Sequence, residues 1–528
     1  MIRATSLAPT GAALRHPALL AAALGAAVLL ASCGSGSGSA TGASGTPPAV
    51  QTVVSTSTLL PASCGTALGS AQDAYDPGSA VQPQLAVLAP GGAAGSLSPA
   101  MMAVWEQDRW NAIGTRAIAY SYSADGGQTW RAPGALPFSA CGVATGGGAG
   151  AGASYDRASD PSVAISTAGS GPAVVLASSL AFSAGGFLAA GGTSAVLMAR
   201  SLDGGLTWQA THAAIQDSNS ASGTAYFNDR DAIAADPAGP NAYLVWDRIS
   251  SVAGASIPTW MAHSGNSGAT WDAARVIYDP GTGCQTFNNQ PLVLPDQSVV
   301  VIFTLLPNGL SFCGPELSMI RSTDHGTTWP VSGAATKIAA INPVGTRNPI
   351  PNGAPIRDSA NLAQAAVDPA SGAIAAVWQE SSFSGGVRDG IAFTISRDQG
   401  ASWSLPIQVN GQPGVAAFDP CLHFGAGGRI AVTYYDLRAY SAGSSVLSTT
   451  LWLRESTDFG QTWSADRRID GPFDLNLAPP ADQAAGTTGK ALFLGDQQGL
   501  GWNGASWTPV YAATVLQGAR VFAAQVAP

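Results

Sequence analysis

This sequence has few charged side chains for its length. Only 10% of its 528 residues are Asp, Glu, Lys or Arg, whereas 46% are hydrophobic. A chain with this much apolar content can bury a large core, so the composition excludes a disordered protein. The formal net charge of -9 gives no global attraction for nucleic acid. We therefore expect no nucleic-acid partner.

Several common signals are missing. No spacing of cysteine and histidine is typical of a zinc site, and we expect neither a metal nor a cofactor. No segment after residue 30 is long and apolar enough for a transmembrane helix, and no long amphipathic helical pattern is present. Turn-forming residues are abundant instead, with 64 glycines and 35 prolines. They are typical of a chain with many short strands.

The N-terminus has the pattern of a targeting segment. Arg3 and Arg15 accompany an apolar run of residues 18–30, which is too short to span a bilayer comfortably. The run ends in Leu30-Ala31-Ser32-Cys33, which resembles a bacterial lipobox. The resemblance implies cleavage before Cys33 and acylation of that cysteine. We expect an exported protein that is held in the bacterial cell envelope by its lipid alone.

This pattern divides the chain into three parts. We predict a lipoprotein signal peptide at residues 1–32, a flexible Gly/Ser-rich tether at 33–48 and one folded domain at 49–528. We expect the mature protein to be a monomer.

An exported chain can form disulfides. Cys284 and Cys313 flank a predicted hairpin, whose antiparallel pairing would bring them together. Cys64 and Cys141 could form a second disulfide. Cys421 lies in the apolar run FDPCLHF and is predicted to be a buried free thiol.

One motif, Ser-x-Asp-x-Gly-x-Thr-Trp, recurs at intervals of 58 to 78 residues. In this turn the Asp can accept backbone hydrogen bonds, the Gly can take a positive φ and the Trp can pack between sheets. Repetition in every unit indicates a structural role and a repeat architecture. The copies are Ser123–Trp130, Ser201–Trp208, Ser264–Trp271 (with Asn266 in place of Asp), Ser322–Trp329, Ser396–Trp403 (with Ser402 in place of Thr) and Ser456–Trp463.

These motifs resemble the Asp-boxes, or BNR repeats, of sialidases and related β-propellers. The resemblance implies an all-β fold of four-stranded antiparallel blades, with each box between the third and fourth strands. Three short apolar runs precede each box, as this requires. We predict six Asp-box blades and a seventh formed by three runs within residues 490–526. A strand from residues 49–57 would complete that blade and join the two ends of the chain.

The segments ahead of the innermost strands carry the candidate site. Sialidases hold a substrate carboxylate with three arginines, so the resemblance implies that Arg157, Arg230 and Arg357 bind substrate. It also implies an aspartate as general acid, either Asp156 or Asp160. A tyrosine nucleophile could be Tyr434 or Tyr435. Corresponding segments elsewhere contain Asn288-Asn289-Gln290, Asp419 with His423, and Asp496-Gln497-Gln498.

Two features depart from the sialidase pattern. No Arg-Ile-Pro motif precedes the first box, and no glutamate is placed to activate the candidate tyrosines. Two functions therefore stay open. One is a glycoside hydrolase resembling an exo-α-sialidase, which would release terminal sialic acid or a related anionic sugar. The other is a non-catalytic propeller that binds glycans or proteins, with its arginines paired to neighbouring aspartates.

Overall fold

The computed structural model contains a compact unit, Pro47–Pro528. Within it the structure describes residues 49–64, 74–88, 101–111, 113–146, 150–166, 173–183, 188, 190–309, 313–330, 334–482, 490–516 and 518–528. The predicted signal peptide, the tether and Cys33 lie outside the described residues. Among the helices of the described part, none has the length and apolar content to span a membrane.

The described chain is almost entirely β-structure, as predicted. Its main sheets have four antiparallel strands each, taken in chain order apart from the last sheet. They consist of β2 (Ala80–Val87), β3 (Met101–Arg109), β4 (Thr115–Ser123) and β5 (Gly134–Ala135); β6 (Arg157–Ser166), β7 (Val174–Phe182), β8 (Thr193–Ser201) and β9 (His212–Ser218); β10 (Tyr226–Ala235), β11 (Ala242–Ser250), β12 (Thr259–Ser264) and β13 (Arg275–Tyr278); β14 (Cys284–Val293), β15 (Val299–Pro307), β16 (Glu316–Ser322) and β17 (Thr336–Ala340); β19 (Gln364–Val367), β20 (Ile374–Glu380), β21 (Gly390–Ser396) and β22 (Ile407–Gln408); β23 (Ala417–Phe424), β24 (Ile430–Asp436), β25 (Ser448–Ser456) and β26 (Arg467–Asp474); and β29 (Gly499–Trp502), β30 (Trp507–Val515), β31 (Gly518–Gln525) and β1 (Val50–Val53). A single residue pair, Thr115 with Ala158, links the first two of these sheets.

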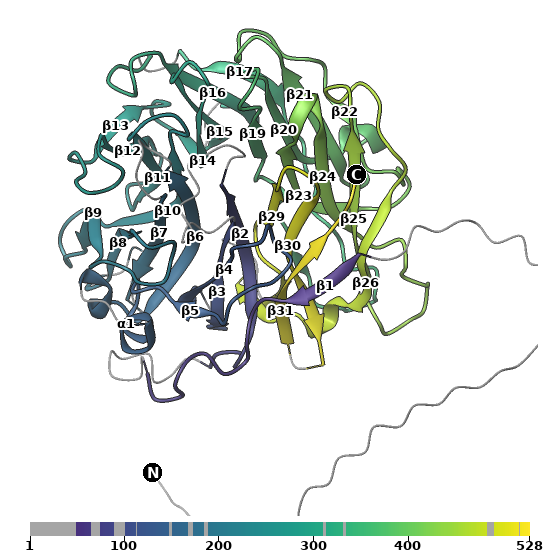
Figure 1. Ribbon diagram of the computed structural model, residues 1–528, viewed down its shortest axis with the longest axis horizontal. Coiled ribbons are helices and arrows are strands. Elements are labelled where there is room, and N and C mark those ends of the chain that lie inside the picture. Colours follow the sequence, from purple (N-terminus) through teal and green to yellow (C-terminus); the bar gives the residue numbers. More distant parts are fainter. Residues whose placement is uncertain are drawn as a thin grey trace, which may run out of the picture. The chain divides into compact units, whose positions relative to one another are not determined.

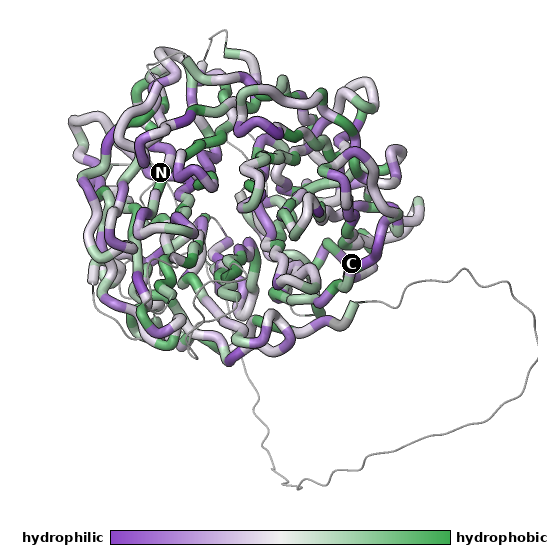
Figure 2. The backbone as a smooth tube through the Cα atoms, turned by 45° about the horizontal axis from the view of Figure 1, so that its top comes forward, coloured by the Kyte–Doolittle hydropathy of each residue, from purple (hydrophilic) through white to green (hydrophobic). Residues whose placement is uncertain are grey.

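The sheets follow one another around a common axis. Their innermost strands contact each other in the order β2, β6, β10, β14, β19, β23, β29 and back to β2 (Figure 1). This is the arrangement of a β-propeller. Apolar stretches occur in every sector of the ring (Figure 2), because each pair of adjacent sheets buries its own core cluster. The centre is left to polar side chains of the innermost strands.

Helical segments are few and short in the described part. The α-helix α1 (Ala140–Gly146) follows the first sheet, and the 3-10 turns η2 (Ala151–Ser154), η3 (Ser382–Ser384), η4 (Ala426–Gly428) and η5 (Leu475–Leu477) lie in connections.

The two ends of the described chain meet in one sheet. β1 pairs antiparallel with β31, from Val50 opposite Gln525 to Val53 opposite Phe522. The predicted partner for the N-terminal strand is therefore correct. The predicted first strand of this sheet is the run KALFLGDQQGL, residues 490–500. Only the end of that run enters the sheet, in β29, whereas its start forms β28 (Lys490–Phe493), which pairs with β18 (Ile356–Arg357) and β27 (Pro480–Asp482) in a separate small sheet.

Five of the six repeated turns use the same hydrogen bonds, whereas in the copy with Asn266 the side-chain amide donates to the Thr270 hydroxyl. In the last copy, the Ser456 hydroxyl donates to Asp458 Oδ1 and accepts from the amide of Gly460, while Asp458 accepts from the amide and hydroxyl of Thr462. These donors lower the pKa of Asp458 to about 2. An aspartate held in this way stabilises its turn and is not available for catalysis.

The glycine of each turn also contacts the preceding sheet. Gly460 has a φ of +81°, and a Cβ there would lie 2.4 Å from Phe393 Cε1 in β21. A Cβ on Gly205 would lie 2.3 Å from Met102 Cε in β3. The turn glycine is therefore needed for its φ and for the close approach of adjacent sheets.

The tryptophans of the turns are half-buried, whereas the sequence predicts that they are largely buried. Trp130, Trp208, Trp329 and Trp463 each lie at the edge of an inter-sheet cluster. Fully buried tryptophans lie instead on the second strands, at Trp105, Trp246 and Trp378. The difference arises because each turn projects beyond the sheets that its tryptophan covers.

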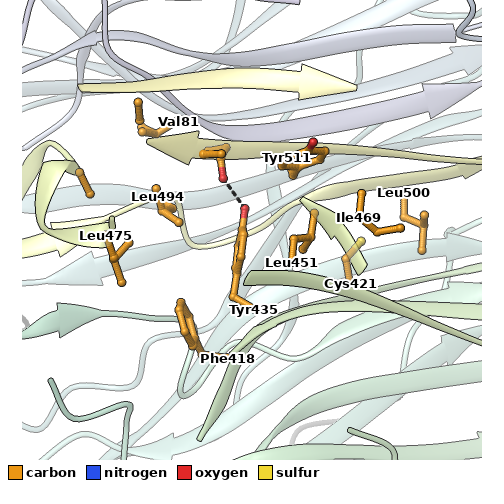
Figure 3. Close-up of a cluster of buried hydrophobic side chains, with 14 of the residues drawn as sticks. Val81, Phe418, Cys421, Tyr435, Leu451, Ile469, Leu475, Leu494, Leu500 and Tyr511 are labelled. Carbon is orange, nitrogen blue, oxygen red and sulfur yellow. Dashed lines mark hydrogen bonds between the residues drawn. The ribbon is translucent and has the colours of Figure 1, made fainter. Parts of the chain in front are cut away.

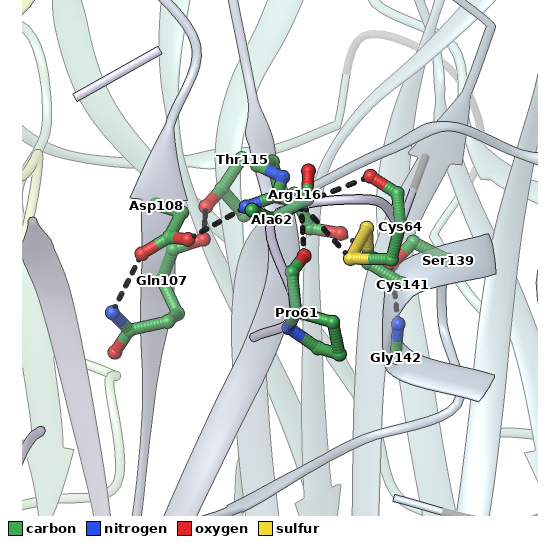
Figure 4. Close-up of a disulfide and its surroundings, with 10 residues drawn as sticks. All are labelled: Pro61, Ala62, Cys64, Gln107, Asp108, Thr115, Arg116, Ser139, Cys141 and Gly142. Carbon is green, nitrogen blue, oxygen red and sulfur yellow. Dashed lines mark hydrogen bonds and ion pairs between the residues drawn. A yellow bond between two sulfur atoms is a disulfide. The ribbon is translucent and has the colours of Figure 1, made fainter. Parts of the chain in front are cut away.

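Two disulfides join the expected cysteine pairs. Cys64 bonds to Cys141, and Cys284 at the start of β14 bonds to Cys313. Arg116 lies beside the first bond and donates to the carbonyls of Pro61, at 2.6 Å, and Cys64, at 2.9 Å (Figure 4). Cys421 is a buried free thiol, and burial raises its pKa to about 12.

Candidate functional site

The innermost strands share an irregularity at the same place. In β2, β6, β10, β14 and β23 the pairing with the second strand shifts register, and the first unpaired residue has a left-handed backbone. A positive φ is uncommon for residues with a Cβ and marks a position held by its surroundings. These residues are Gln82 (φ 55°), Asp160 (51°), Arg230 (54°), Asn288 (57°) and Asp419 (48°). A bulge of this kind redirects side chains, and here it acts at the same level in five sheets.

The register shift shows which residues are structurally equivalent. Ser159 pairs just before the shift in β6, as Asp229 does in β10. Asp160 is therefore equivalent to Arg230, and Arg157 corresponds to Phe227. The candidate segments at residues 227–231, 288–290 and 419–423 lie within β10, β14 and β23, which begin earlier than expected.

The predicted set of three arginines is consequently wrong in one member. Arg157 is fully buried away from the centre, where it donates to the carbonyl of Ile113 at 2.8 Å and lies over the Trp110 ring, 4.9 Å from its centroid. Its Nε is 3.9 Å from an oxygen of Asp156, which is also buried. Asp156 and Arg157 thus stabilise the start of β6, and neither lines the central pocket.

Arg230 and Arg357 do come together, as predicted, on one carboxylate. Arg230 Nη2 donates to Asp496 Oδ2. Arg357 donates to the same carboxylate twice, from Nη2 at 2.7 Å and Nε at 3.2 Å. Asp496 is 2% exposed, and the two guanidiniums hold its pKa well below the usual range, outweighing burial. The protein's own carboxylate therefore occupies the place where the sequence predicts a substrate carboxylate.

A further arginine near this cluster is Arg109, which sequence reasoning missed as a site residue. Arg109 and Arg357 both lie over the ring of Phe493, at 4.3 and 4.9 Å from its centroid. Arg109 donates to Glu106 at 2.5 Å, and the second oxygen of Glu106 accepts from the Ser159 hydroxyl at 2.7 Å. Each arginine at the centre of the ring thus has a carboxylate partner.

A pocket of about 150 Å³ opens beside this cluster, among the innermost strands of neighbouring sheets. Its charged lining consists of Asp160, Arg230 and Asp231. Three amides with partly exposed side chains, Gln84, Gln364 and Gln497, also line it, and they make no hydrogen bonds within the described structure. The remaining lining residues are Ser162, Val163, Ala232, Ile233, Asn288, Asn289, Gln290, Pro291, Leu292 and Ala365. The pocket offers hydrogen-bonding groups for a small polar ligand.

Asp231 is the most unusual group in the pocket. It is 5% exposed, and although the Ser178 hydroxyl and the Leu180 amide lie close enough to lower its pKa, neither makes a hydrogen bond of ordinary geometry to its oxygens. Burial outweighs them and, strengthened by the nearby charge of Asp160, raises the pKa of Asp231 well above the ordinary value. The raised pKa favours the protonated acid, which can donate a proton in the pocket.

Asp160 is the second carboxyl group of the pocket. It is 6% exposed and accepts a hydrogen bond from Gln82 Nε2 at 2.7 Å. Asp160 and Gln82 are equivalent residues of adjacent sheets, so the register shift that redirects Arg230 also orients this pair. The sequence predicts a site role for Asp160, and the structure places it in the pocket.

Other buried carboxyl groups surround the pocket. Burial and the charge of Asp160 raise the pKa of Asp229 to about 7, although Arg230 opposes the shift. Burial also raises the pKa of Asp247 and of Asp419 well above the usual range. Asp247 accepts from the Asn288 amide, Thr286 and Asn289, and thereby supports the neighbouring bulge.

The two candidate tyrosines are structural. Tyr434 lies between two sheets and donates to Asp466 at 2.5 Å, while Tyr435 donates to the carbonyl of Ala512 at 2.6 Å (Figure 3). Burial raises the pKa of both hydroxyls. Neither lines the pocket, and none of the lining residues is a tyrosine or a glutamate. The predicted tyrosine nucleophile is therefore wrong for both residues.

Two of the residues that matter were visible in the sequence. Asp231 follows Arg230 directly, and Asp496 lies in a segment that the sequence aligns with the segments ahead of the other innermost strands. Their roles depend on which side chain points inward after a register shift, which the alternation of a regular strand does not reveal. The run Asp160-Pro161, repeated as Asp419-Pro420 and as Gln82-Pro83, is the one signal that could have aligned the strands.

No family profile and no curated protein matches this chain. Among solved structures it is similar to the α-L-arabinofuranosidase Arb93A from Fusarium graminearum, at 14% identity and a TM-score of 0.44, over 69% of this chain and 91% of that one. It is similar to the Hadza microbial sialidase Hz136, at 13% and 0.40, over 85% and 66% of the two chains. A Trypanosoma rangeli sialidase matches at 11% and 0.40, over 85% and 55%. Likenesses this distant concern the fold and carry no argument about substrate.

Proposed function

We propose that this protein is a glycoside hydrolase whose active site is the central pocket. One observation carries the proposal. Asp231 is a nearly buried carboxyl group with a raised pKa and with no hydrogen bond of ordinary geometry to its oxygens, and it lines a polar pocket beside a second carboxyl group, Asp160. Buried polar groups are normally hydrogen-bonded, so an exception in a pocket indicates a functional site.

Hydrolysis of a glycoside requires two carboxyl groups in different protonation states. Asp231, whose protonated form is favoured by burial, would protonate the departing glycosidic oxygen. Asp160 would act as the carboxylate, either attacking the anomeric carbon or activating a water molecule. The free amides of Gln84, Gln364 and Gln497 would hold the sugar by its hydroxyl groups.

The charge of the site favours a neutral sugar over the anionic sugar of the sialidase prediction. Arg230 and Arg357, which would have bound a substrate carboxylate, are both paired with Asp496. The pocket itself adds two carboxyl groups to the single guanidinium of Arg230. With no surplus of positive charge, an anionic sugar would gain little to offset its desolvation.

The test is a comparison of Asp231→Asn with the wild type on a panel of neutral nitrophenyl glycosides and one sialoside. We expect the wild type to cleave a neutral member, and the variant to lose about 10²–10⁴-fold in kcat with KM nearly unchanged. Asp389→Asn is the matched control, because Asp389 is a buried carboxyl group with a raised pKa that lies outside the pocket, and its hydrogen-bond partners Val344, Gly345 and Gln379 do not line the pocket. Equal kcat in the Asp231→Asn variant and the wild type would contradict the proposal.

A second function, non-catalytic glycan binding, is favoured by the absence of a tyrosine or glutamate among the lining residues. In that case the wild type would bind a sugar of the panel in calorimetry without cleaving it. Asp231→Asn would then alter affinity alone.

We also propose that the chain is exported and anchored through a lipid on Cys33. The sequence pattern of residues 18–33 supports this, and so do two disulfides, which persist in oxidising compartments. Metabolic labelling with a fatty-acid analogue should mark the wild type and not Cys33→Ser. A label retained by the variant would contradict the assignment.

A further inference from the structure

We propose that Asp496 determines the specificity of the pocket, because it fills a carboxylate seat between Arg230 and Arg357 and so excludes anionic sugars. This inference rests on the proposed pocket, but it concerns which ligands enter and not the chemistry.

The geometry of the seat is that of carboxylate recognition. Arg357 offers two donors to the Asp496 carboxylate, and Arg230 offers a third from a different sheet. The planar guanidinium group of arginine recognises a carboxylate through such paired N–H donors. The seat adjoins the pocket, since Arg230 and Gln497, the neighbour of Asp496, both line it.

The backbones of the two arginines are held by strand pairing and do not depend on the Asp496 side chain. Arg230 lies at the register shift of β10, where its left-handed φ is fixed by the bulge. Arg357 ends β18, which pairs with β28. Because their backbones are held in this way, removing the Asp496 side chain should leave both guanidiniums near their present positions.

Several carboxyl groups near these arginines are already engaged. Glu106 pairs with Arg109 and accepts from Ser159, and Asp160 accepts from Gln82. Asp229 has its pKa raised by burial, although Arg230 and Arg357 both lower it. Without Asp496, Arg230, whose side chain is 9% exposed, and Arg357, whose side chain is 30% exposed, would lose the carboxylate that they share, and a small anion can take its place.

The seat can be tested by chemical rescue in the full mature chain. Asp496→Ala should unfold at a lower temperature than the wild type, and sodium acetate should restore much of the loss. Acetamide, which has nearly the same size and no charge, should not, and sodium chloride at equal ionic strength controls for screening. The wild type should respond equally to all three additives.

A second measurement compares the affinities of the wild type and the variants for an anionic sugar directly. We expect N-acetylneuraminic acid to bind Asp496→Ala about ten- to a hundredfold more tightly than the wild type in calorimetry, a gain consistent with one charge-assisted interaction. Adding Arg230→Gln to that variant should abolish the gain. Asp496→Asn, which keeps the side-chain volume, should gain less than Asp496→Ala.

Three results would overturn the inference. These are equal affinities of wild type and Asp496→Ala for N-acetylneuraminic acid, a gain that survives Arg230→Gln, and an Asp496→Ala chain that acetate fails to stabilise or refold. None of these readouts requires turnover. A pocket that binds the acid in Asp496→Ala while the wild type cleaves no glycoside would contradict the hydrolase proposal and leave the seat intact.

Discussion

Arg230 in β10 occupies the position that Asp160 occupies in β6. Each is the left-handed residue at the register shift of an innermost strand, with φ values of 54° and 51°. Residues of opposite charge at equivalent positions lie at the same level of the ring, and both line the pocket. Two of the three charged residues that line the pocket, Asp160 and Arg230, thus come from the same structural position in different sheets.

The first prediction concerns stability and pH. The pKa of Asp229 is about 7 in the folded protein, above its ordinary value of 3.8. The unfolded chain therefore releases this proton first, so stability from Asp229 is complete below about pH 4 and is lost as pH rises through 7. Asp229→Asn should reduce the fall in unfolding free energy between pH 5 and pH 8, measured with urea. A fall as steep as in the wild type would contradict the assignment.

The second prediction concerns the turn glycines. Gly460→Ala should destabilise through its φ of +81° and through the contact with Phe393. Gly443 is the matched control, because its φ is +83° and a Cβ there would meet nothing within 4 Å. We expect about 1–2 kcal/mol for Gly443→Ala and a further 1–3 kcal/mol for Gly460→Ala. Equal losses of stability for Gly460→Ala and Gly443→Ala in thermal unfolding would show that the turn at Gly460 does not pack closely against β21.

The third prediction separates two kinds of tryptophan. Trp378 is 1% exposed in an inter-sheet cluster, whereas Trp463 is half-buried at the edge of another. Trp378→Ala should cost about 3–5 kcal/mol, the range for a core aromatic, and Trp463→Ala about half of that. Denaturant titration of both variants measures the difference, and the reverse ranking would be inconsistent with this packing.

The fourth prediction concerns the disulfides. The bond between Cys64 and Cys141 closes a separation of 77 residues, and the bond between Cys284 and Cys313 closes 29. Chain entropy predicts losses of about 4.5 and 3.5 kcal/mol when each pair is changed to alanine. The loss of stability for the first pair should exceed its chain-entropy value, because the Arg116 guanidinium also donates to the carbonyls of Pro61 and Cys64, which lie beside this disulfide. A smaller loss for the first pair than for the second would contradict this.

The fold was predictable because its signals are local and repeated. Each turn motif specifies its own hydrogen bonds, and short apolar runs between the motifs specify the strands. In the predicted run of residues 490–500 the first part, Lys490–Phe493, lies in another sheet, although it is apolar and short like the other strands. Its true partner, Ile356–Arg357, lies more than a hundred residues away, and no local pattern indicates such a pairing.

The site was less predictable, because strand register decides which side chains line the pocket. Arg157 and Arg230 each follow an aspartate in the sequence, yet they differ by three positions in the sheets. Tyr434 and Tyr435 lie in an apolar run like any core residues, and burial alone decides their role. Asp496 could not be chosen from the sequence, because its importance depends on two arginines from other sheets.

The pairing of β1 with β31 constrains how this chain is made. The Val521 amide donates to the Ser55 hydroxyl across 466 residues of sequence, so the first strand leaves the ribosome long before its partner exists. Until then β1 has no partner strand, and the incomplete series of sheets has an unpaired edge at each end. Truncation near the C-terminus should therefore leave a product prone to aggregate even when every earlier sheet is complete. A circular permutation that joins the present ends of the chain and opens new ends in an outer turn would place β1 directly after β31. The ribosome would then make the two partner strands in immediate succession.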